Sequence, residues 1–132
     1  MKRSILLECI NTAKKRNTPE LHNQYEFFAH TSFFIQDNKI LGFDVNKGGD
    51  PETYLGYGKL RKKHSEREAF KKTRHKLDMN KGFSVINIRL NKKGDLMLSK
   101  PCDTCYEFLS DIGCSSVLFS TSQGFAELKF RK

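Results

Sequence analysis

Two short segments of this chain carry residue types that could perform chemistry: His-Ser-Glu at residues 64–66 and Pro-Cys-Asp-Thr-Cys at residues 101–105. One imidazole and two thiolates are ligands that zinc favours, and three protein ligands leave a fourth coordination position open. A carboxylate that is not itself a ligand can transfer protons beside such a site. The sequence therefore predicts a catalytic zinc site formed by His64, Cys102 and Cys105, with Glu66 as the proton carrier.

The spacing inside each motif brings its side chains together only at the start of a helix. Cys102 and Cys105 are three residues apart, so both sulfurs face one side of the first helical turn. The partial positive charge of a helix N-terminus favours the thiolate form that binds metal. His64 and Glu66 are two residues apart and would diverge in mid-helix, so they converge only if His64 begins its helix.

Each motif also has a more ordinary interpretation. A C-x-x-C pair alone occurs in redox sites and structural zinc sites, and His64 lies in a charged segment that could be only a solvated helix face. The sequence has no second C-x-x-C to complete a four-cysteine structural site. An expected helix and strand separate the two motifs, and this combination favours a catalytic site.

Composition and charge set broad limits. The 132 residues, 37% of them hydrophobic, are enough for one globular domain covering residues 1–132. The net charge of +9 favours RNA, DNA or a nucleotide as partner, although a solvated basic surface would give the same charge. No apolar run approaches the roughly 20 residues that span a bilayer. We therefore expect a cytoplasmic protein without a membrane partner, whose cysteines are reduced or metal-bound.

Periodicity and turn signals predict alternating helices and strands. Helices are expected at 4–15, at 64–77 and from Pro101 to a capping Gly113. Strands are expected at 25–35, 40–45, 83–90, 116–120 and 125–130, with a long loop over 46–63. This order indicates an α/β fold with helices covering a sheet. Both motifs fall at helix starts, where such sheets commonly place their sites.

The combination H-x-E followed by P-C-x-x-C resembles the cytidine deaminase-like superfamily of zinc nucleobase deaminases. The resemblance covers nearly the whole chain in element order, whereas residue identity is specific only at the two motifs. It implies a three-layer sandwich in which helices cover a mixed five-stranded sheet. It also implies that the cofactor is Zn²⁺, held by His64, Cys102 and Cys105, and that Glu66 shuttles protons.

Two features narrow the resemblance to one branch. Deaminases of free nucleosides usually have cysteine at the first ligand position, where this chain has His64. Transfer-RNA adenosine deaminases and antiviral polynucleotide cytidine deaminases have histidine, but also a helix between their last two strands. Residues 121–124 are too few for a helix and predict an antiparallel hairpin. Histidine with a terminal hairpin is similar to plant organellar RNA-editing domains and bacterial toxin-type deaminases.

The resemblance also suggests substrate contacts. Asn46 follows the second strand, where the family often places an asparagine near the substrate sugar, although a turn asparagine would look the same. Tyr54 and Tyr57 in the same loop could stack on a base or only pack the loop. Lys100 could touch a phosphate. The other candidates lie within or beside the two motifs: Ser65, Ser99 and Pro101.

Basic residues cluster around the His64 helix. They either form a solvated face or guide a nucleic-acid strand, and the second is favoured because they border the expected pocket. They are Lys59, Arg61, Lys62, Lys63, Arg67, Lys71, Lys72, Arg74 and Lys76. His30 has no ligand-like spacing to the motifs and is assigned no role.

Three functions are compatible with these residues. The favoured one is a zinc-dependent hydrolytic deaminase that converts cytosine to uracil in single-stranded DNA or RNA. The same site would serve a deaminase of free cytidine, deoxycytidine or their monophosphates in pyrimidine salvage. The third function is a non-catalytic nucleic-acid-binding module stabilised by zinc. The intact Glu66 argues against this last possibility, because a structural site has no need of that carboxylate.

Overall fold

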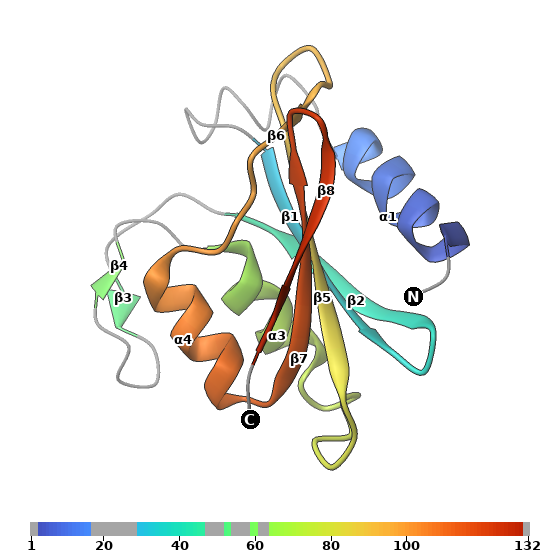
Figure 1. The fold of residues 1–132 in the computed structure, drawn as a ribbon. Coiled ribbons are helices and arrows are strands. Elements are labelled where there is room, and N and C mark those ends of the chain that lie inside the picture. Colours follow the sequence, from blue (N-terminus) through green and yellow to red (C-terminus); the bar gives the residue numbers. More distant parts are fainter. Residues whose placement is uncertain (1–2, 17–28, 47–51, 54–58, 61–63, 131–132) are drawn as a thin grey trace.

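A computed structural model describes residues 3–16, 29–46, 52–53, 59–60 and 64–130 (Figure 1). The helices are α1 (Arg3–Arg16), α3 (Ser65–Thr73) and α4 (Asp103–Asp111). The strands are β1 (Ala29–Gln36), β2 (Lys39–Val45), β3 (Glu52–Thr53), β4 (Lys59–Leu60), β5 (Phe83–Leu90), β6 (Leu96–Met97), β7 (Cys114–Thr121) and β8 (Gly124–Lys129).

The main sheet is mixed, as the sequence predicts. Its long strands lie in the order β2-β1-β5-β7-β8, and the short β6 pairs with β5 as a sixth strand that the sequence did not indicate. Only the β5–β7 pairing of this sheet is parallel among the described strands. The expected terminal hairpin is present, because β7 and β8 pair antiparallel from Thr121 and Gly124 at the turn.

Helices cover both faces of this sheet, which confirms the three-layer sandwich (Figure 1). Alternate residues of a strand face opposite sides. On β1, Phe33 and Ile35 join the core beneath α1, whereas Phe34 joins the core beneath α3 and α4. The two motifs therefore belong to helices on the same face of the sheet.

The β1–β2 hairpin turns at Asp37 and Asn38, which have φ values of 54° and 58°. Two successive residues with positive φ form the type I′ turn whose twist suits a two-residue hairpin. Gly42 of β2 lies directly under α3, where a Cβ atom would collide with Thr73 Cγ2. The glycine therefore allows α3, the helix that follows His64, to pack closely against the sheet.

Two regions differ from the sequence prediction. The expected loop over 46–63 contains a small ladder in which Glu52 pairs with Leu60 in β3 and β4. Helix α3 ends at Thr73 rather than at residue 77, and in the turn that follows the Thr73 carbonyl accepts hydrogen bonds from Lys76 and Leu77. No helix among the described residues has the length and apolarity that a membrane-spanning helix requires.

Candidate metal centre and active site

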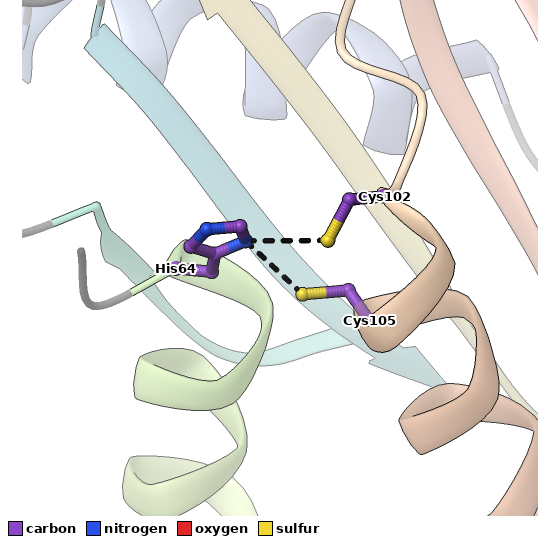
Figure 2. Close-up of side chains that lie close together, drawn as sticks. All are labelled: His64, Cys102 and Cys105. Carbon is purple, nitrogen blue, oxygen red and sulfur yellow. Dashed lines mark hydrogen bonds between the residues drawn. The ribbon is translucent and has the colours of Figure 1, made fainter. Parts of the chain in front are cut away.

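The three expected ligands converge where two helices begin (Figure 2). His64 is the N-cap of α3 and Cys102 is the N-cap of α4, and both have extended backbone conformations. Cys105 lies in the first turn of α4 and is fully buried. Pro101 therefore precedes the cap, rather than occupying the first helical turn as the sequence analysis expected.

The distances in this cluster suit a metal ion. His64 Nδ1 lies 3.6 Å from Cys102 Sγ and 3.2 Å from Cys105 Sγ, and the three ligand atoms all lie within 4.8 Å of one another. Tetrahedral zinc, with bonds of about 2.0–2.3 Å, separates neighbouring nitrogen and sulfur ligands by about 3.6 Å. One nitrogen and two sulfurs form a donor set typical of zinc.

The electrostatics of the cluster also favour a cation. Hydrogen bonds from Cys105 and from His64 lower the pKa of the Cys102 thiol to about 3. The same pairing with Cys102, together with burial, raises the pKa of Cys105, and the hydrogen bond to Cys102 raises that of His64. These shifts favour the thiolate form of Cys102, and a bound divalent metal would replace the protons of its two neighbours.

Glu66 lies beside the cluster, only 1% exposed. Asn87 Nδ2 donates to Glu66 Oε2 at 3.1 Å, and Ser65 Oγ donates to Glu66 Oε1 at 3.3 Å. Asn87 is itself held, because Ser32 Oγ donates to its Oδ1 at 2.7 Å and its Nδ2 also donates to the Ser99 carbonyl at 3.2 Å. Both oxygens of the carboxylate are therefore held, one by Asn87 of β5 and the other by Ser65 of α3.

Asn87 and Ser32 were not identified from the sequence. They are paired across β1 and β5, and both side chains are fully buried. The available signal was Asn87 itself, a polar residue between Ile86 and Ile88 in the middle of a strand. A buried amide in a central strand requires polar partners, and here those partners include the carboxylate of Glu66.

Two of the predicted substrate-binding residues have buried side chains with structural partners. Asn46 is 8% exposed. Its side-chain Oδ1 accepts a hydrogen bond from the backbone amide of His30, and its backbone amide donates to the His30 carbonyl, each at 2.9 Å. Ser65 Oγ lies 2.7 Å from Ser32 Oγ. Asn46 thus ties the end of β2 to β1, and Ser65 ties α3 to the same strand.

The remaining candidates for substrate contact differ in how exposed their side chains are. Ser99 is buried, and its hydroxyl donates to the Asn87 carbonyl at 2.9 Å, whereas Lys100 is exposed and Pro101 is buried. Tyr54 and Tyr57 lie outside the described residues.

Arg67 is not part of the basic surface that the sequence predicts, because its side chain is 0% exposed. It lies near enough to the cluster for its charge to oppose the upward pKa shifts of His64 and Cys105. The first turn of α3 is buried on all sides, so a cation there faces the interior. The basic residues of the same helix that are exposed are Lys71 and Lys72, followed by Arg74 and Lys76.

His30 also lies at the site, although the sequence assigned it no role. Burial is the largest effect on its imidazole and lowers its pKa, while the charges of Glu66 and Cys102 oppose that shift. Its neighbour across the sheet is Arg89. Only the pairing of β1 with β5 reveals this position, because His30 is distant from both motifs in the sequence.

No protein-family model matches the chain, and no curated protein matches it significantly. A solved structure does: the dCMP deaminase from the cyanophage S-TIM5, in complex with dCMP and dUMP. The match has a TM-score of 0.59 at 17% sequence identity and covers 90% of this chain and 82% of that one. This chain has the fold of a dCMP deaminase. At such low identity the likeness extends to the fold alone.

Proposed function

We propose that this chain is a zinc-dependent hydrolytic deaminase that converts cytosine to uracil. The observation that carries the proposal is the junction of two helix starts, where a nitrogen and two sulfurs are spaced for zinc beside a buried, oriented carboxylate. A structural zinc site would not need Glu66 to be held on both oxygens. The dCMP deaminase fold supports the same chemistry.

The residues of the chain divide the reaction between them. The chemistry that zinc supplies when bound is a lowered pKa for water, which gives a nucleophile at neutral pH. His64, Cys102 and Cys105 would hold the metal. Glu66 takes a proton from the attacking water and passes it to the ring nitrogen and then to the departing amine, so that cytosine and water become uracil and ammonia. Asn87 and Ser65 keep the carboxylate aimed during these transfers.

Single-stranded DNA or RNA is the substrate class that the charge favours. The net charge is +9, and Lys71 of α3 and the following Arg74 and Lys76 are exposed. Part of this surface is engaged within the protein, since Lys71 pairs with Glu68 at 3.0 Å and Lys72 with Asp44 at 3.3 Å. A flexible single strand could present an unstacked cytosine to the site.

A mononucleotide is the second candidate substrate, because the S-TIM5 protein with this fold is a dCMP deaminase in complex with dCMP and dUMP. The deciding experiment measures uracil formation from cytidine, CMP, dCMP, a single-stranded DNA oligomer and a single-stranded RNA oligomer. Turnover on an oligomer that weakens with added salt supports the polynucleotide substrate. Turnover on CMP or dCMP alone supports the second candidate. A zinc-loaded protein inactive on all five would contradict the proposed function.

Replacing Asn87 by leucine should lower kcat by about 10–100-fold, the usual loss when a supporting residue of a metal site is removed. The change leaves Glu66 without the donor on Oε2 but removes no metal ligand. Turnover and zinc content are measured together. Ser84→Ala is the matched control, since it removes a hydroxyl from the same strand that bonds Ser116 instead of Glu66. Unchanged kcat in Asn87→Leu would show that Glu66 needs no such support.

A further inference from the structure

On the face of the sheet beneath α3 and α4, the side chains of β1 and β5 change from apolar to polar along the strands. Its cross-strand pairs, from the core outward, are Phe34 with Val85, Ser32 with Asn87, and His30 with Arg89. The first pair belongs to the apolar core, and the second contacts Ser65 and Glu66. Because the pairs share one face, His30 and Arg89 form the next row beyond the one that orients the carboxylate.

His30 is held firmly in this row. Its backbone amide and carbonyl are both bonded to Asn46, each at 2.9 Å. On the same face of the sheet, the next cross-strand pair is Ser32 with Asn87, and Asn87 bonds to Glu66. Arg89 beside it has a defined orientation, since its Nη1 donates to the Leu98 carbonyl at 3.3 Å.

The imidazole nevertheless leaves one polar atom unused. Within the described structure, Nε2 of His30 is buried and has no hydrogen-bond partner. Buried polar atoms without partners are rare in proteins and destabilise the folded state, so each one needs an explanation. An apolar residue would fill this strand position without that cost. A ligand that supplies the missing partner would explain why histidine occupies it.

We propose that His30 is a substrate-binding residue whose Nε2 hydrogen-bonds to the cytosine nucleotide bound beside Glu66. This inference rests on the proposed function. Glu66 and the metal ligands must face the carbon that carries the amine. His30 lies one row farther out and contacts a polar group of the nucleotide away from that carbon. It takes no part in proton transfer and acts on substrate binding.

The test compares His30→Val and His30→Gln on whichever substrate the wild type converts. Loss of one hydrogen bond should raise KM roughly tenfold in His30→Val, with zinc content unchanged. Glutamine can place its amide nitrogen near the position of Nε2, so His30→Gln should recover part of this loss. The melting temperature of His30→Val should stay constant or rise, because an unpartnered buried atom is removed. A purely structural histidine would give the opposite result, a lower melting temperature and an unchanged KM.

Gln36→Val is the matched control at the other end of β1. The Gln36 amide is fully used there, since Nε2 donates to the Asp78 carbonyl at 2.8 Å and Oε1 accepts from the Asp78 amide at 2.9 Å. Its replacement should lower the melting temperature and leave KM unchanged. Equal KM values for wild type and His30→Val would overturn the proposal.

A binding measurement separates this proposal from the proposed function. The ¹⁵N resonance of His30 Nε2, assigned by its loss in His30→Val, is followed while dCMP, CMP or a cytosine-containing oligomer is added to zinc-loaded Glu66→Gln protein. A shift of Nε2 without wild-type turnover would support nucleotide contact and contradict deamination. Turnover without a shift would overturn only the role of His30. Absence of both would overturn both.

Discussion

Replacing Glu66 by glutamine is expected to lower kcat by about 10³–10⁴-fold, toward the upper end of what a single proton-transfer group contributes. Glutamine has nearly the same shape, and its amide can still bond to Asn87 and Ser65. It cannot accept a proton from water or return one to the ring. Because Glu66 is not one of the three clustered ligands, the zinc content should remain one ion per chain.

Glu68→Gln is the matched control for this change. It removes the same charge two residues farther along α3, from a carboxylate that is also largely buried and pairs with Lys71. Its kcat should stay within about twofold of wild type, since its carboxylate pairs with Lys71 and is not one of the clustered ligands. Both variants are assayed under single-turnover conditions with zinc measured on the same samples. If Glu66→Gln kept more than a tenth of the wild-type kcat, another group would have to carry the proton.

The clustering of His64, Cys102 and Cys105 could be predicted from the sequence because its determinants are local. Three-residue spacing in a helix start fixes the relative positions of Cys102 and Cys105, and the need for His64 and Glu66 to converge placed His64 at the start of its helix. The structure places His64 and Cys102 at those caps. The terminal hairpin was equally local, since a short connection between two strands leaves few other arrangements.

The residues that orient Glu66 could not be predicted in this way. Ser32 and Asn87 lie 55 positions apart in the sequence and meet only because β1 pairs with β5 in one register. A slip of β1 by one residue would turn Ser32 to the α1 face, while Asn87 would stay on the face beneath α3 and α4. Strand alternation indicates which residues share a face, but it does not indicate which strand is the neighbour.

Arg67 shows a second limit of sequence reasoning. Its position in a run of basic residues favoured a solvated or nucleic-acid-binding side chain. Every residue of α3 from Ser65 to Phe70 is buried. A charge count treats Arg67 like Lys71, although only the second is exposed. The charge available for nucleic acid is therefore smaller than the sequence suggests.

Replacing Cys105 by serine is expected to remove zinc and with it almost all activity, a loss of at least about 10³-fold in kcat. Cys105 is the fully buried ligand, and its sulfur lies closest to His64. Serine at that position is a poor zinc ligand near neutral pH because its hydroxyl is not ionised. Since metal binding contributes directly to the stability of the folded state, the variant should also unfold at a lower temperature, close to that of wild-type protein treated with a chelator.

Cys114→Ser distinguishes this effect from the general cost of changing a buried cysteine. Cys114 is 1% exposed, lies outside the cluster, and donates to the Ser116 carbonyl at 3.2 Å, a bond that serine can keep. This variant should retain one zinc ion per chain and near-normal kcat, and its melting temperature should still rise when zinc is added. Cys105→Ser should show no such rise, because its remaining ligands, His64 and Cys102, are too few to hold the ion tightly. If Cys105→Ser kept stoichiometric zinc, the metal would be bound elsewhere and the assignment of this cluster would be wrong.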